Sequence, residues 1–94
     1  MTTIFPLQES KIEIRGRLCT VRELTHQRRA EISKLIVEDK FRGPALWASA
    51  GCVDPPITEE QCSNESAEIV DKLARETMKL CGLLRDEEGD GKKD

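Results

Sequence analysis

Hydrophobic and polar residues follow two different spacings along the chain. Over residues 11–15 they alternate one by one, which is typical of a half-buried β-strand. Gly16 then supplies a turn, and residues 18–20 can return as a second strand. Because an isolated two-stranded hairpin is marginal in water, we expect this hairpin to pack on a helix.

Helical spacing begins after the hairpin. Thr20 and Glu23 fit a capping box, so the pattern predicts a helix from there to about Lys40 or Phe41, ending before Gly43-Pro44. One stripe of this helix is ordinary core: Val21, Leu24, Ile32, Leu35 and Ile36. Almost opposite lie three further apolar residues and the single histidine: Ala30, Val37, Phe41 and His26. A helix with apolar groups on two sides is either sandwiched within its own fold or shared with a neighbouring chain.

The middle of the chain predicts shorter elements. Residues 45–50 are small or apolar and indicate one or two helical turns, closed by Gly51. Residues 52–56 should be extended, because each of the two prolines biases the residue before it away from the α region. Thr58 and Gln61 fit a second capping box, which indicates a short helix or turn.

The clearest pattern is an amphipathic helix over residues 66–84, with Ser66 as its N-cap and Gly82 placed to end it. Its apolar arc contains Ala67, Val70, Leu73, Ala74, Thr77, Leu80, Cys81 and Leu84. Its charged arc contains Glu68, Asp71, Lys72, Arg75 and Lys79.

These elements predict a small α+β fold that is mainly α, with a short N-terminal β-hairpin packed on two main helices and additional short helical turns. We expect an irregular arm at residues 1–10, a single domain at 11–84 and a disordered charged tail at 85–94. Only 21 Val, Ile, Leu, Met, Phe and Trp residues fall between Lys11 and Leu84. Such a thin core favours a chain that completes its core with copies of itself or with a partner.

Charge and segment composition exclude several classes of function. The net charge is −3, from 15 basic and 18 acidic residues, and glutamates are interleaved with the arginines of residues 13–31. No basic stripe is therefore expected, and nucleic acid is not a predicted partner. There is no long apolar run and no signal-peptide pattern, so we expect no membrane association and a cytoplasmic location.

Candidate chemistry is sparse. The cysteines are Cys19, Cys52, Cys62 and Cys81, with no CxxC spacing, so reduced and mostly buried thiols are expected rather than a metal site. The single His26 cannot support a catalytic constellation, and no cofactor-binding motif occurs. We therefore expect no enzymatic activity, no cofactor and no metal. The single Trp47 is either a core residue or an interface anchor.

Taken in order, KIEIRG, TVREL, the VDPP turn, the TEEQ cap and the helix SAEIVDKLARETMKLCGL resemble the tail assembly chaperones of long-tailed bacteriophages. The resemblance covers residues 11–84. It implies a non-enzymatic protein that binds the helical tape-measure protein and keeps it soluble during tail morphogenesis. It also implies the host cytoplasm as the location, absence from the mature virion, and a longer form of the chain made by frameshifting as a further partner.

Under this interpretation, the predicted partner-binding residues are Val37, Phe41, Leu46 and Trp47, and the chain is expected to form a homo-oligomer. The alternative is a small helical adaptor or DNA-binding regulator of phage origin. That alternative would place Arg22, Arg28 and Arg29 on a recognition helix.

Overall fold

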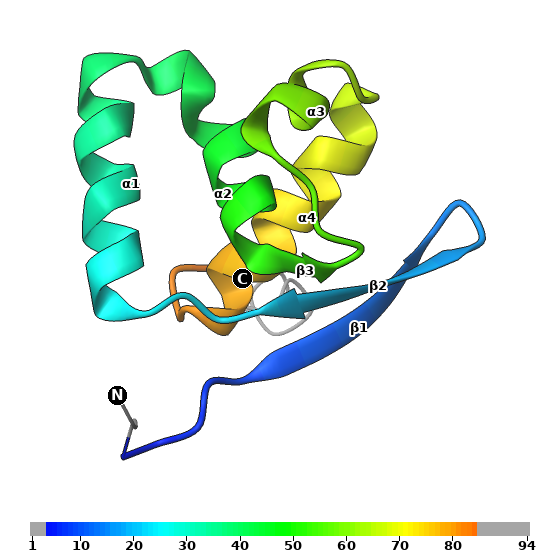
Figure 1. The fold of residues 1–94 in the computed structure, drawn as a ribbon, viewed down its shortest axis with the longest axis horizontal. Helices are drawn as coiled ribbons and strands as arrows, with labels where there is room; N and C mark the ends of the chain where they lie inside the picture. Colours follow the sequence, from blue (N-terminus) through cyan, green and yellow to red (C-terminus); the bar gives the residue numbers. More distant parts are fainter. Residues whose placement is uncertain (1–3, 85–94) are drawn as a thin grey trace, which may run out of the picture.

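The protein is a small α+β fold in which an N-terminal hairpin and a later third strand form one sheet that packs beside the helices (Figure 1). The structure is a computed structural model that describes residues 4–84. The predicted tail at 85–94 and the first three residues of the predicted arm lie outside the described residues. Within the rest of the predicted arm, residues 4–8 precede the first strand, which begins two residues earlier than the predicted domain boundary.

The hairpin formed by β1 (Glu9–Ile14) and β2 (Arg17–Arg22) confirms the alternating pattern. The strands are antiparallel, with Ile12 opposite Cys19. The two turn residues, Arg15 and Gly16, have φ values of 52° and 81°, as a tight two-residue hairpin turn requires. The third strand, β3 (Cys52–Asp54), pairs antiparallel with β2, so β2 is central and β1 forms an edge.

The first long helix, α1 (His26–Glu38), starts five residues later than predicted, since its N-cap is Thr25 instead of Thr20. Thr20 lies in β2, and the N-cap is Thr25, whose Oγ1 accepts a hydrogen bond from the backbone N–H of Arg28 at 3.1 Å. The predicted capping box at Thr20 and Glu23 is therefore wrong. Glu23 instead accepts a hydrogen bond from the backbone N–H of Gln8, which extends the hairpin pairing.

The predicted break at Gly43-Pro44 is the start of the next helix. α1 ends at Glu38, a 3-10 turn η1 (Lys40–Arg42) follows, and α2 (Gly43–Gly51) begins with the proline in its first turn. Proline is compatible with that position because the first helical N–H groups have no intrahelical partner. Figure 1 shows α1 standing at one side of the molecule, joined to α2 through η1 at an outer corner.

The two later caps are confirmed. Thr58 and Gln61 form a complete capping box for α3 (Glu59–Ser63), and Ser66 caps α4 (Ala67–Leu80). Gly82 has a φ of 80° and donates to the carbonyl of Lys79, while the Leu83 N–H donates to the carbonyl of Met78. These two bonds close the end of α4 as a glycine C-cap does.

The core lies between α2, α4 and the inner face of the sheet. The most extensive packing joins α2 and α4, and the hairpin packs on α4, where Ser10 donates to Glu76 at 2.8 Å and Arg15 donates to Glu68 at 3.1 Å. The predicted apolar arc of α4 supplies Val70, Leu73, Ala74 and Thr77 as buried residues. By contrast, α1 buries only Ile32 completely, so most of its surface faces outward.

Candidate functional site

Two large apolar side chains protrude where α1 leads into α2. The exposed fractions of Val37 and Phe41 are 85% and 86%. The Asp39 carboxylate accepts a hydrogen bond from the Phe41 backbone N–H at 3.1 Å, which fixes the direction in which this segment leaves α1. Most single exposed apolar residues need no explanation, but two of them beside an apolar hollow indicate an interaction surface.

A groove, here called the Trp47 groove, has a volume of about 540 Å³ and includes Ile36, the neighbour of Val37 in the sequence, in its lining. Its lining residues come from the end of α1, from α2, from α4 and from the segment just after α4: Ile36, Gly43, Pro44, Trp47, Asp71, Ala74, Arg75, Met78 and Leu84. Most of these side chains are apolar, and the charged ones come from α4. The groove can therefore accept an apolar side chain from another molecule.

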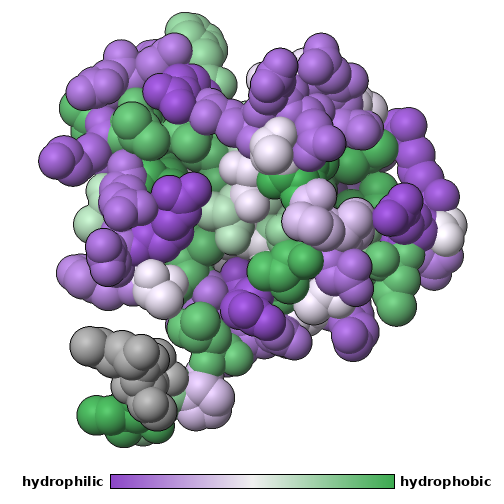
Figure 2. Space-filling view, viewed as in Figure 1, coloured by the Kyte–Doolittle hydropathy of each residue, from purple (hydrophilic) through white to green (hydrophobic). Residues whose placement is uncertain are grey.

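A second, shallower hollow of about 340 Å³ is lined by Phe41 itself and is here called the Phe41 hollow. Pro44 and Asp71 line both the Phe41 hollow and the Trp47 groove, so the two depressions adjoin. We refer to Val37, Phe41 and these two depressions together as the junction surface. Figure 2 shows hydrophilic residues over most of the visible face, with hydrophobic residues between α1 and α2 and in further patches toward the hairpin side of the view.

The structure separates the four predicted partner-binding residues into two pairs. Val37 and Phe41 are exposed as predicted. Leu46 and Trp47 are 3% and 5% exposed and belong to the core, because they lie on the face of α2 that packs inward. Little of either side chain is therefore exposed for a partner to contact. Trp47 still borders the junction surface as a lining residue of the groove.

Some of the charged side chains around the junction surface form ion pairs, and others do not. Arg42 holds Glu59 with two hydrogen bonds of 2.8 and 2.9 Å, and these bonds lower the pKa of the Glu59 carboxyl. The pair connects η1 to α3 and so fixes the η1 turn that carries Phe41. The side chains of Lys40 and Asp71 form no hydrogen bond or ion pair with any other residue in the range 4–84.

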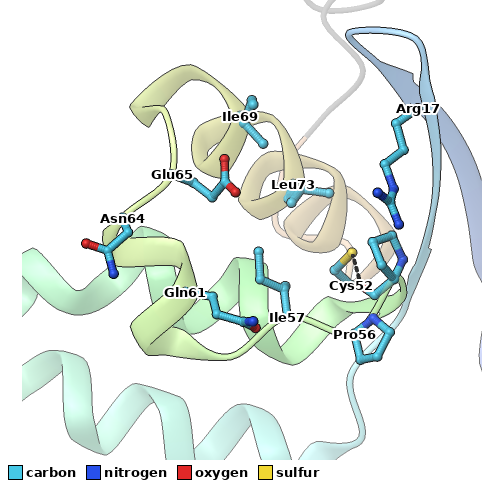
Figure 3. A pocket seen from close by; sticks show the side chains of 10 residues that line it. Arg17, Cys52, Pro56, Ile57, Gln61, Asn64, Glu65, Ile69 and Leu73 are labelled. Carbon is cyan, nitrogen blue, oxygen red and sulfur yellow. Dashed lines mark hydrogen bonds between the residues drawn. The ribbon is translucent and has the colours of Figure 1, made fainter.

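A third hollow, of about 430 Å³, lies on another part of the molecule between β3, α3 and α4 (Figure 3). At its base the Cys52 thiol donates to the carbonyl of Pro55 at 3.2 Å. Burial raises the pKa of Cys52 to about 11, so the neutral thiol prevails at physiological pH and is a poor nucleophile. The Gln61 side chain at its rim already completes the α3 capping box.

The remaining chemistry-bearing residues are dispersed. All four cysteines are free; three are buried and Cys81 is half-buried, which confirms the expected burial of most of the thiols. His26 is an exposed residue at the start of α1. Arg28 pairs with Glu31 at 3.1 Å, so part of its charge is compensated on its own helix. Residues 4–84 contain no group of three or more potential metal ligands close enough to share an ion.

Sequence reasoning missed the residues that shape the groove. Met78 flanks the predicted apolar arc of α4 rather than lying in it, and Pro44 indicated only a helix end. A wider apolar arc on α4 was the available signal for Met78. Nothing in the sequence indicated that Pro44 would stand between two depressions, because that depends on how α2 packs on α4.

Among residues 4–84, every helix is too short or too polar to cross a lipid bilayer. Comparison with models of protein families, with curated proteins and with solved structures finds no match for this chain.

Proposed function

We propose that this protein is a non-enzymatic tail assembly chaperone of a long-tailed bacteriophage or prophage, and that its client is the tape-measure protein. The proposal starts from the sequence resemblance over residues 11–84. The structural observation that supports it is the junction surface. Val37 and Phe41 protrude beside an apolar groove on a molecule whose residues are 35% charged.

The chemistry of the junction surface suits a helical apolar client. An amphipathic helix binds in a groove through apolar side chains spaced three or four residues apart along one of its faces. The Trp47 groove and the Phe41 hollow adjoin at Pro44 and Asp71, so they offer two successive positions for such side chains. Large aromatic residues commonly provide much of the binding free energy in interfaces, and Phe41 is the exposed aromatic residue of the junction surface.

The charged exterior supplies the second property that a chaperone needs. Polar side chains, many of them charged, cover most of the exposed surface of α1, and charged side chains lie on the outer face of α4. A complex that buries Val37 and Phe41 against an apolar client would present these charges to water and remain soluble. In this proposal the protein acts in the bacterial cytoplasm, has no cofactor, and leaves before the virion matures. A frameshifted longer form would carry the same junction surface.

The test is size-exclusion chromatography with light scattering on the full chain, alone and mixed with a fragment of the tape-measure protein encoded by the same phage or prophage. We expect the mixture to elute as a soluble complex whose mass equals the sum of its components. Separate elution of the two proteins, or precipitation of the fragment in the presence of the chain, would reject the proposed function.

A further inference from the structure

We propose that the junction surface is self-complementary: two copies of this chain form a two-fold dimer in which Phe41 of each copy enters the Trp47 groove of the other. The inference goes beyond the proposed function and does not depend on the identity of any client. It commits to a second copy of the chain as the occupant of the groove.

The first observation is that a protruding side chain and a receiving groove lie next to each other on one chain. Phe41 is 86% exposed, and its own depression shares Pro44 and Asp71 with the groove of about 540 Å³. In a two-fold interface the same patch is used by both copies, so each contact occurs twice. A patch that holds both a protruding side chain and an adjacent groove meets this requirement, because each copy can insert its side chain into the groove of the other.

The second observation is charge complementarity. Lys40 precedes Phe41 directly, and Asp71 lines the groove that would receive Phe41. Neither side chain has an ion-pair partner within the described part of the chain. When Phe41 enters the groove of a second copy, Lys40 is carried toward the Asp71 of that copy. Each buried phenyl ring is then flanked by an ion pair between Lys40 of one copy and Asp71 of the other.

The third observation concerns where the surface lies. The η1 turn forms an outer corner of the molecule, on the side away from the hairpin tip (Figure 1). Another copy can therefore approach it without meeting the sheet. The turn is also held in shape, since Asp39 caps it and Arg42 is fixed by two bonds to Glu59. A turn that is already held in one conformation loses little conformational freedom on binding, which favours association.

Sedimentation equilibrium of the full chain tests the proposal, because it gives the dimer dissociation constant directly. We expect a reversible monomer–dimer equilibrium for the wild type. Phe41→Ser should raise the dissociation constant at least tenfold, as expected for removing a central aromatic anchor twice. The matched control is Leu18→Ser, which removes another exposed apolar side chain (61% exposed) on β2, near the hairpin tip, and should leave the constant unchanged.

Charge exchange tests the specific geometry. Lys40→Glu and Asp71→Lys should each raise the dissociation constant, by about tenfold or more, because each creates two like-charge contacts in the dimer. The double variant K40E/D71K should return it to within about threefold of the wild-type value, because it restores both pairs with reversed signs. Both positions are exposed, and circular dichroism should confirm that all three variants keep the fold.

Three outcomes would overturn the proposal: a wild-type monomer up to the solubility limit, self-association that Phe41→Ser does not weaken, or a double charge variant no better than the singles. Trp47 is the only tryptophan and there is no tyrosine, so its emission provides a second readout in the groove. It should change with wild-type concentration and not with that of Phe41→Ser. Client binding uses the same surface and would compete with the dimer, but it is measured separately with the tape-measure fragment, so failure of the dimer would not by itself reject the proposed function.

Discussion

Gly51, the last residue of α2, lies against the side chain of Thr77 in α4 with no room for a β-carbon. A Cβ built on Gly51 would collide with Oγ1 of Thr77 and lie 2.6 Å from its Cγ2. Thr77 is fully buried, and its hydroxyl donates to the carbonyl of Leu73 at 2.9 Å, so it cannot easily move aside. This contact sets how closely α2 and α4 approach, and these two helices form the base of the Trp47 groove.

We predict that Gly51→Ala lowers the free energy of unfolding by about 1–3 kcal/mol, because the added methyl group overpacks the α2–α4 contact. Urea denaturation followed by circular dichroism measures the change. The matched control is Gly43→Ala in the same helix, where a Cβ would lie 3.8 Å from Ile36, an ordinary contact distance. That variant should be as stable as the wild type. Equal stability of both alanine variants would show that the Gly51–Thr77 contact does not limit the packing.

The hydrogen-bonded pair of Arg42 and Glu59 should respond to substitution and to pH. Arg42→Lys keeps the charge but cannot make the two parallel bonds of 2.8 and 2.9 Å, so we predict a lower melting temperature. Arg28→Lys is the control, since Arg28 makes a single bond to Glu31. It should leave the melting temperature unchanged. An Arg42→Lys variant with the wild-type melting temperature would contradict the stabilising role of the pair.

The pH dependence of this pair has a definite sign. Because the bonds from Arg42 lower the pKa of Glu59 below 4.5, the folded state releases its proton more readily than the unfolded chain. The contribution to stability is therefore present above about pH 4.5 and is lost as the pH falls through the pKa of the folded state. Glu59→Gln should remove this part of the acid destabilisation. The measurement is the difference in melting temperature between the variant and the wild type at neutral and acidic pH.

Ionisation of the buried Cys52 thiol should lower the stability of the fold at alkaline pH. Burial raises its pKa from 9.0 to about 11, so the unfolded chain loses the thiol proton at lower pH than the folded protein does. Its contribution to stability is complete below pH 9 and is lost as the pH rises through about 11. Compared with Cys52→Ala, the wild type should lose stability more steeply over this interval. Parallel curves for the two proteins would show that Cys52 is not held as a neutral thiol.

Much of the fold follows from local signals that the sequence states directly. Thr58, Gln61 and Ser66 act as helix caps because their side chains bond to backbone groups only two or three residues away. Such contacts need no information about tertiary packing. The same holds for the positive φ of Gly16 and Gly82, which mark a hairpin turn and a helix end.

The helix start was predicted wrongly because two local signals compete there. The sequence Thr20-Val-Arg-Glu23 fits a capping box, but pairing with β1 and β3 extends β2 through Arg22 and the helix begins after Thr25. The exposure of Val37 and Phe41 was predictable from their helix face. The sequence left Trp47 as either a core residue or an interface anchor. The burial of Leu46 and Trp47 depends on which side of α2 meets α4, and the sequence alone does not specify that side.

The most direct test of the chaperone proposal measures binding of a fluorescently labelled tape-measure fragment to the wild-type chain and to three serine variants. We predict that Phe41→Ser weakens binding by about tenfold or more and that Val37→Ser weakens it less, because the aromatic side chain buries more apolar area. Leu18→Ser, which removes an exposed leucine outside the junction surface, should bind as the wild type does. Equal affinities for all four proteins, or no binding by the wild type, would contradict the assignment of the junction surface as the client-binding site.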